Sequence, residues 1–283
     1  MSRICLTGGT GFVGRQILKH LRDQGHKVRL IQRPNWSQKL TAYSGDISSG
    51  DIEIVETDDL FSENVDWWKQ AFDGVSIVIH SAWYVEPGLY LTSPKNMDCL
   101  KGTLTMAQAA KAQSVSRFVG IGTCIEYDIK TETLLTTASP YNPTTIYSAA
   151  KLSLYQTLSH YFQDNDVSFL WGRLFYLYGE GEDPRRFTAF LHQKMQDGDV
   201  ADLTKGTQIR DFMNVSDAGK LIVNLSFSGK EGGANICTGH GRTIREIAEE
   251  IADNYGRRDL LNFGARAENL VDPKFIVGEP TLP

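Results

Sequence analysis

The chain of 283 residues has no long hydrophobic run, no closely paired cysteines and no excess of positive charge. No apolar stretch approaches the length of about 20 residues that a membrane-spanning helix needs, and glycines interrupt the only candidate for a signal peptide. We therefore expect a cytoplasmic protein without a membrane partner. The formal net charge of −5 argues against binding to nucleic acid, which relies on a dense basic surface.

The few cysteines are scattered, and none forms a C-x-x-C pair. This spacing is not that of a zinc site or of a disulfide framework. We therefore expect reduced thiols and no bound metal; the cysteines are Cys5, Cys99, Cys124 and Cys237.

A glycine-rich turn near the N-terminus is the most informative feature of the sequence. A short apolar run at residues 4–6 predicts a strand, apolar side chains at helical spacing over residues 13–21 predict a helix, and residues 27–31 predict a second strand. Such a β-α-β unit needs glycine where the chain bends sharply and where a pyrophosphate approaches the backbone. The helix would direct its free N–H groups at the phosphates. We prefer this reading to an ordinary surface turn, and we assign to a dinucleotide cofactor Gly8, Gly11, Phe12, Val13 and Gly14.

Strands and helices continue to alternate along the chain. Apolar segments at residues 52–56, 77–79, 117–122 and 167–171 predict further strands with helices between them. This alternation predicts an α/β fold with a doubly wound parallel sheet covered by helices on both faces. We expect residues 1–172 to bind the dinucleotide and residues 173–283 to form mainly a smaller substrate lobe, with part of 208–240 returning to the first domain.

The late part of the chain also contains a helix signal. Thr243 and Glu246 have the spacing of a capping box, and apolar residues follow at helical spacing. We therefore expect a helix of the smaller lobe to begin there.

Tyr147 and Lys151 are the strongest candidates for chemistry. Their Y-x-x-x-K spacing places them one turn apart on a predicted helix. A neighbouring ammonium favours the phenolate, which makes a tyrosine a better acid and base near neutral pH. The spacing alone is common, and by itself it would indicate only a pair on a helix surface.

The glycine-rich opening, Tyr147 and Lys151, and Thr123 at the end of the fifth predicted strand together resemble the extended short-chain dehydrogenase/reductases. Residues 173–179, 210–215 and 235–239 also look like segments of the epimerase/dehydratase members that modify nucleotide sugars. The resemblance implies a Rossmann-type domain with a C-terminal substrate lobe. It also implies a homodimer formed through helices near residues 95–112 and 145–163.

The same resemblance implies roles for the catalytic residues. Thr123 would hold the substrate oxygen, Tyr147 would act as acid and base, and Lys151 would bind the nicotinamide ribose while lowering the pKa of Tyr147. One departure concerns the usual proton relay, because Cys99 stands where the family often has an asparagine.

The choice of cofactor depends on the end of the second predicted strand. NAD-binding proteins place a carboxylate there against the ribose 2′-hydroxyl, whereas this chain has Gln32 followed by Arg33. Arg33, with Arg15 as a second candidate, could pair with a 2′-phosphate, so NADP(H) is favoured over NAD(H) unless both arginines are solvated surface charges. By resemblance, Asp59, or Asp58 one residue earlier, and Leu60 would contact the adenine, and further cofactor residues would be Ser81, Ala82 and Trp83.

The expected partner is a nucleotide-diphosphate sugar. By resemblance, Arg210 and Arg266 would clamp its diphosphate, as planar bidentate groups suit that role. Arg185 and Arg186 follow a loop that would close over the sugar nucleotide, and Phe175 could pack on the sugar. The alternative for Arg185 and Arg186 is a pair of solvated surface charges, and the alternative for Phe175 is an aromatic ring packed in the core.

The residues after Thr123 discriminate between reactions. Sugar-nucleotide 4,6-dehydratases carry Asp-Glu there, but this chain has Cys124 and Ile125, which cannot supply the acid and base of an elimination. GDP-fucose synthases, which epimerise a sugar before reducing it, have a cysteine two residues after their serine, whereas Cys124 follows Thr123 immediately. Adjacent side chains on an extended strand face opposite ways, so we expect Cys124 to pack in the core rather than to act on a sugar.

Three functions remain after this elimination. The first is NADPH-dependent reduction of the 4-keto group of a nucleotide-linked 4-keto-6-deoxy sugar; residues 122–128 resemble those of CDP-4-keto-6-deoxyhexose reductases such as the paratose and abequose synthases. The second is a nucleotide-sugar 4-epimerase with tightly bound NAD. The third is a non-catalytic protein that senses NADP.

Overall fold

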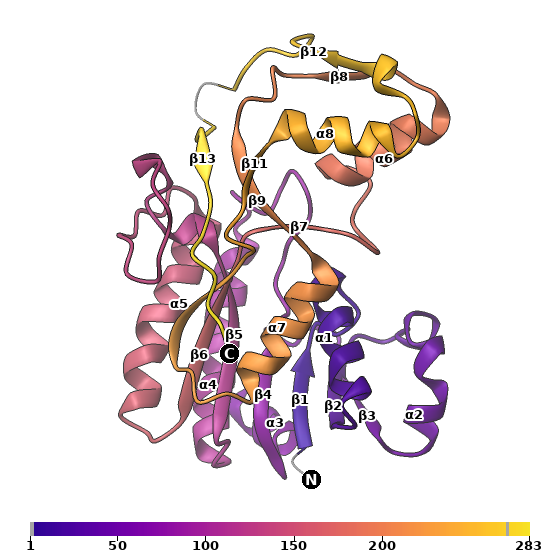
Figure 1. Ribbon diagram of the computed structural model, residues 1–283. Coiled ribbons are helices and arrows are strands. Elements are labelled where there is room, and N and C mark those ends of the chain that lie inside the picture. The colour runs from indigo at the N-terminus through magenta and orange to yellow at the C-terminus, as the bar shows by residue number, and fades with distance from the viewer. Residues whose placement is uncertain (1–2, 270–271) are drawn as a thin grey trace.

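The computed structural model describes residues 3–269 and 272–283. Its centre is a seven-stranded sheet in the order β10-β6-β5-β4-β1-β2-β3, in which every neighbouring pair is parallel (Figure 1). The strands are β1 (Arg3–Thr7), β2 (Lys27–Gln32), β3 (Ile52–Glu56), β4 (Val75–His80), β5 (Arg117–Thr123), β6 (Ser168–Leu174) and β10 (Gly232–Ile236). This is the doubly wound α/β fold that the sequence predicted.

Helices cover both faces of this sheet because its strands are apolar on both sides. Ile4 and Leu6 of β1 pack against α1 (Phe12–Asp23) and α7 (Val215–Ser226). Cys5, between them, faces the opposite layer, as the two-residue period of a strand requires. That layer consists of α3 (Val65–Ala71), α4 (Lys95–Ala112) and α5 (Ile146–Gln163). The short α2 (Ser44–Ser48) precedes β3.

Apart from α7 and β10, the elements after β6 form smaller sheets and helices beyond the carboxyl ends of the large sheet (Figure 1). In one of them β9 pairs with three partners, and its strands are β7 (Tyr176–Tyr178), β9 (Ile209–Asn214), β11 (Gly241–Thr243) and β13 (Phe275–Ile276). We call the outermost layer the small lobe; it comprises α6 (Phe187–Asp197), β8 (Ala201–Leu203), α8 (Ile244–Asp253) and β12 (Leu261–Phe263). The domain boundary at residues 172 and 173 stays a prediction.

The helix expected after Thr243 is present as α8. The Thr243 hydroxyl accepts from the Glu246 amide at 3.1 Å, and the Glu246 carboxylate accepts from the Thr243 amide at 2.7 Å. This confirms the capping box. Within the described residues, no helix is both long enough and apolar enough to cross a membrane.

Candidate active site

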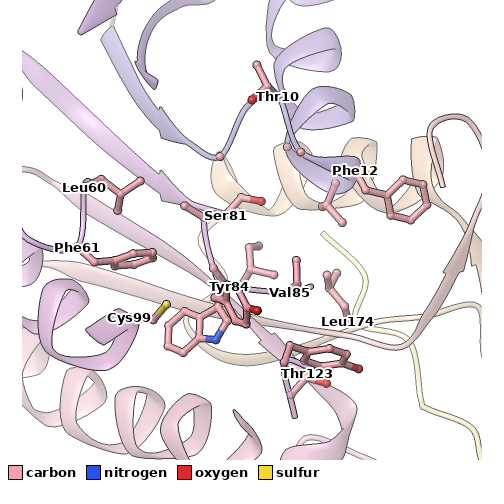
Figure 2. A pocket seen from close by; sticks show the side chains of 18 of the residues that line it. Thr10, Phe12, Leu60, Phe61, Ser81, Tyr84, Val85, Cys99, Thr123 and Leu174 are labelled. Atoms are coloured by element: carbon pink, nitrogen blue, oxygen red, sulfur yellow. The ribbon is translucent and has the colours of Figure 1, made fainter. Parts of the chain in front are cut away.

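A cavity of about 720 Å³ opens at the carboxyl ends of the parallel strands. Ligands of open α/β sheets bind at this edge, where the strand order reverses; here the reversal lies between β1 and β4. In Figure 2 the turn carrying Thr10 and Phe12 lies across the cavity from Cys99 and Thr123. The predicted site residues that line it are Gly8, Gly11, Phe12, Val13, Gly14, Arg33, Asp59, Leu60, Ser81, Ala82, Trp83, Thr123, Tyr147, Lys151 and Phe175.

The glycine turn forms one wall, and its backbone leaves no room for side chains. A Cβ on Gly14 would lie 2.0 Å from the carbonyl oxygen of Gly8, and Gly8 itself has a φ of +73°. Gly11 precedes α1, and no described side chain caps that helix end. Its first N–H groups and positive dipole end are therefore available to an anion in the cavity, so these residues fit the diphosphate of a dinucleotide.

At the far end of β2 the cavity is polar and positive. Gln32 is 6% exposed, and its Oε1 accepts from the Thr10 hydroxyl at 3.1 Å. Its Nε2 is buried and has no partner among the described residues. Arg33 and Lys39 also line the cavity. Of the two aspartates considered for the adenine, Asp59 lines the cavity and Asp58 does not. Arg15 instead reaches the carbonyl oxygens of Gly11 and Thr10, at 3.4 and 3.5 Å.

Two capped turns bring the Tyr147 and Thr123 side chains together. Thr145 begins α5 with a capping box that includes Ser148, which places Tyr147 in the first turn facing the cavity. Thr123 ends β5 and caps the short helix at Cys124–Glu126. The Thr123 side chain lies near the Tyr147 phenol and lowers its pKa, against the larger effect of burial. The cavity thus presents two neighbouring hydroxyl groups.

Lys151 lies beside this pair but does not act on Tyr147 as expected. Its Nζ donates to the Ile121 carbonyl oxygen at 2.6 Å and lies 3.8 Å from the centre of the Trp83 ring. Burial, opposed by Glu126, lowers the pKa of Lys151 to about 7.

The pKa of Tyr147 is raised, chiefly by burial and then by the nearby Tyr90 and Glu126. The expectation that Lys151 lowers this pKa therefore does not hold in this structure. The reason is geometric, because the ammonium is directed at a backbone carbonyl and an indole ring.

The sequence analysis missed the residues behind the hydroxyl pair. The Trp83 indole N–H donates to Asn96 Oδ1 at 2.8 Å, which fixes the ring over Lys151. Glu126 is fully buried, accepts from the Thr123 amide at 2.8 Å and pairs with Arg173 at 2.8 Å. Thr123 and Glu126 have the same spacing as the capping box at Thr243 and Glu246. This spacing is the sequence signal that could have identified Glu126.

The structure differs from the sequence prediction at three arginines. Arg185 is exposed and pairs with Asp183 and Glu86 outside the cavity, whereas the next residue, Arg186, lines the cavity. A two-residue spacing favours the Arg185–Asp183 pair, since both lie on one tight turn.

Arg210 and Arg266 are not among the described cavity-lining residues either. Arg210 is 3% exposed and donates to Asp272 at 2.8 Å, so a carboxylate already compensates its charge. The Arg266 guanidinium lies in the small lobe, 5.7 Å from the centre of the Phe190 ring. Neither position could be located from the sequence, because both depend on how the segments after β6 fold.

Two side chains near the cavity have packing roles. Cys124 is 4% exposed and packs with Tyr127 and Phe175; burial raises its pKa to about 12, so it remains a thiol. His80 is hydrogen-bonded to Thr7 and Thr103, and burial lowers its pKa to about 3. Neither group titrates near neutral pH.

The comparison with known proteins agrees with this architecture. A family model described as "NAD dependent epimerase/dehydratase family" matches residues 4–236. The chain belongs to this family. The match covers the glycine turn, Thr123, Tyr147 and Lys151.

A curated relative and two solved structures illustrate what this family member is similar to. It is 23% identical over 252 residues to a dTDP-6-deoxy-L-talose 4-dehydrogenase (NAD(+)) of Aggregatibacter actinomycetemcomitans, covering 88% of each chain. The UDP-glucose 4-epimerase of Thermotoga maritima, solved with UDP-glucose, matches with a TM-score of 0.85 at 18% identity, over 99% of this chain and 90% of that one. A dTDP-glucose 4,6-dehydratase of Streptomyces venezuelae, solved with NAD, matches with a TM-score of 0.83 at 20% identity, over 98% and 88%.

Proposed function

We propose that this protein reduces the 4-keto group of a nucleotide-linked 4-keto-6-deoxy sugar with NADPH. The observation that carries the proposal is the pair of neighbouring hydroxyl groups on Tyr147 and Thr123, both of which line a cavity that suits a dinucleotide. The dehydrogenase relative supports the position of the chemistry, since its name specifies carbon 4 of a 6-deoxy sugar nucleotide. Cys124 and Ile125 follow Thr123, so the acid and base of a dehydration are missing at those positions.

The chain's own residues would orient the ketone and supply one proton. A bound nicotinamide supplies the hydride. Thr123 would hold the substrate oxygen by a hydrogen bond, which fixes the carbonyl carbon above the cavity floor. Tyr147 would protonate that oxygen as it becomes an alkoxide; a raised pKa keeps the phenol protonated and ready to donate at neutral pH. Lys151 would bind the cofactor ribose and return a proton to the tyrosine.

The preference for NADPH rests on the end of β2. A carboxylate would accept from a ribose 2′-hydroxyl and repel a 2′-phosphate, whereas Gln32 has a buried, unpartnered N–H group there. Arg33 and Lys39 add two cations to the same end of the cavity. A 2′-phosphate would therefore meet an unpartnered N–H group and two cations at this end of the cavity.

Arg186 is the cation that we propose for the substrate diphosphate. It lines the cavity and directly precedes the first residue of α6. This assignment replaces Arg185, whose guanidinium is held by Asp183 and Glu86.

A direct assay tests the function. Purified protein is mixed with NADPH and each of a panel of 4-keto-6-deoxy sugar nucleotides carrying CDP, dTDP, GDP or UDP, and the loss of absorbance at the nicotinamide wavelength is followed. We expect oxidation with at least one member and an NMR product spectrum with a hydroxyl at carbon 4. Absence of oxidation with every member, using NADPH and NADH alike, would refute the proposal.

The second candidate is a 4-epimerase that keeps NAD bound throughout the reaction. It is favoured by the fold shared with the Thermotoga maritima 4-epimerase and by the NAD in the solved dehydratase. Protein purified through gel filtration would then retain stoichiometric nicotinamide and would interconvert two UDP-sugars without added cofactor. A cofactor-free preparation that turns over only with NADPH would exclude this candidate.

A further inference from the structure

A fully buried ion pair lies directly behind the catalytic hydroxyl groups. The side chains of Glu126 and Arg173 have no exposed surface, and Arg173 Nε donates to Glu126 Oε2 at 2.8 Å. A buried pair of this kind is weak evidence for stability, because the loss of hydration offsets much of the attraction. Its position therefore needs another explanation.

The carboxylate of Glu126 connects this pair to the reacting groups. Its Oε1 accepts from the backbone amide of Thr123 at 2.8 Å, and both of its oxygens accept from the Trp171 indole N–H at 3.1 Å. Every neighbour in these bonds is a donor. Burial raises the pKa of Glu126, and Arg173 and these donors oppose that shift. The donors favour the ionised carboxylate, since a protonated acid would need an acceptor for its proton.

Arg173 is held just as closely. Its guanidinium lies 4.9, 5.0 and 4.3 Å from the ring centres of Tyr127, Tyr141 and Tyr155, and it donates to the hydroxyl groups of Tyr127 and Tyr141 at 3.2 and 3.1 Å. Stacking and hydrogen bonding leave this side chain one arrangement. The carboxylate that it holds is consequently fixed in place.

We propose that Glu126 and Arg173 are positioning residues of this active site: the Glu126 carboxylate fixes the backbone of Thr123, and its buried negative charge favours the charged form of Lys151, which the Ile121 carbonyl and the Trp83 ring hold in place. The inference rests on the proposed function and adds to it the source of the site's electrostatics. Neither residue lines the cavity, so both act through Thr123 and Lys151.

The groups that face Lys151 and Tyr147 set the expected effect. Lys151 is near Glu126, Cys99, Trp83 and the neutral His80, and Glu126 raises its pKa against the effect of burial. Tyr147 is near Tyr90, Glu126, Cys124 and Thr123, and Glu126 raises its pKa as well. Removing the carboxylate should therefore lower both pKa values.

The test replaces both charges together, because E126Q alone leaves a buried guanidinium unpaired. In E126Q/R173Q, protein labelled with ¹³C at the lysine ε carbons is titrated by NMR, with the Lys151 signal assigned from K151M. The wild-type signal should titrate near pH 7. We expect a lower midpoint in the double variant, because Glu126 acts on Lys151 directly whereas Arg173 is not among the groups that shift the pKa of Lys151.

Enzyme kinetics provide a second measurement on the same variant. The alkaline limb of kcat/KM should move to lower pH, and kcat should fall on the order of tenfold, because the neutral amide oxygen in E126Q is a weaker acceptor for the Thr123 N–H than the carboxylate and holds it less firmly. The control is R29Q/E53Q, which removes an ion pair of 3.1 Å between β2 and β3, away from the site. It should lower the melting temperature and leave both pH midpoints unchanged.

Unchanged Lys151 titration in folded E126Q/R173Q would overturn the inference. If that variant does not fold, R173K keeps both charges and should lower the melting temperature without moving the midpoint; a moved midpoint would equally contradict the proposal. The NMR measurement needs no substrate. A wild-type protein that fails every reductase assay while its Lys151 midpoint shifts in E126Q/R173Q would therefore refute the proposed function but not this inference.

Discussion

At the scale of single residues, burial dominates the chemistry of the site. Tyr147 and Lys151 are 9% and 4% exposed, and burial moves their pKa values in opposite directions, upward for the phenol and down to about 7 for the ammonium. The phenol thus stays protonated at neutral pH, while the lysine can gain and lose a proton there. These are the states that a proton donor and its proton source require.

Replacing Tyr147 by phenylalanine tests the proton donor. Y147F removes one hydroxyl and keeps the ring, so we expect kcat of the reductase to fall about 10²- to 10⁴-fold, the range of general acid catalysis. The measurement is steady-state NADPH oxidation. Y161F serves as the control, because Tyr161 lies on the same helix but does not line the cavity; equal activity of the two variants would contradict the role of Tyr147.

Lys151 should make folding depend on pH. Its pKa is lowered from 10.5 to about 7 in the folded protein, so the unfolded chain binds more protons between these values, and the free energy of unfolding rises as the pH increases through that window. At pH 7 and below, K151M should be more stable than wild type, by on the order of 4 kcal/mol.

Urea denaturation at pH 7 and at pH 10.5 measures this effect. The stabilisation by K151M should largely disappear at the higher pH. K19M, which replaces an exposed lysine of α1, should change the free energy of unfolding little at either pH. A K151M protein that matches wild type at pH 7 would show that the lysine is not buried as a cation.

At the scale of secondary-structure elements, capping and close packing place the reactive groups. Thr145 begins α5 and Thr123 ends β5, and each side chain caps the helix that follows it. The turn before α1 depends on glycine in a different way, because its backbone atoms approach one another closely. The catalytic hydroxyl groups and the phosphate site thus both depend on where helices begin.

The glycine turn can be tested with one methyl group. In G14A the new Cβ would lie 2.0 Å from the Gly8 carbonyl oxygen, so the turn must shift. We expect a loss of about 1–3 kcal/mol in the free energy of unfolding and weaker binding of NADPH. The control is G45A in α2, where a Cβ meets no atom within 4 Å and alanine favours the helix; an equal loss in both variants would contradict the packing argument.

The elements themselves were largely predictable from the sequence, and the strand predicted over residues 52–56 has the bounds of β3, but the end of the sixth strand was not predicted. The sixth strand was predicted over residues 167–171, but β6 extends over Ser168–Leu174. The apolar segment in the sequence ends at Trp171, since Gly172 and the charged Arg173 follow it. The strand continues because Glu126, three residues after Thr123 and 47 before Arg173, compensates that charge inside the protein.

At the scale of the whole molecule, the cavity joins the large sheet to the segments that follow β6. Gly8 and Ser81 lie at the ends of β1 and β4, whereas Phe175 and Arg186 come from beyond β6. A ligand that fills the cavity would contact both parts. Binding should therefore stabilise the folded protein as a unit.

Thermal unfolding with and without cofactor measures this coupling. A ligand at a hundredfold excess over its Kd adds about 2.7 kcal/mol to the free energy of unfolding. We expect NADPH to raise the melting temperature by several degrees and NADH, at the same concentration, to raise it less. The Q32D variant should reverse that order; no shift with either cofactor would contradict a dinucleotide site.

The sequence by itself determined the parallel sheet, the glycine turn, and Thr123, Tyr147 and Lys151 as residues that line the cavity. These follow from local rules, since strand and helix periods, glycine spacing and a one-turn separation act over a few residues. Only the tertiary structure decided that Lys151 faces Ile121 and Trp83, that Arg186 rather than Arg185 lines the cavity, and that Asp272 compensates Arg210. Each of these outcomes depends on contacts between residues that are far apart in the sequence, and local sequence patterns do not predict such contacts.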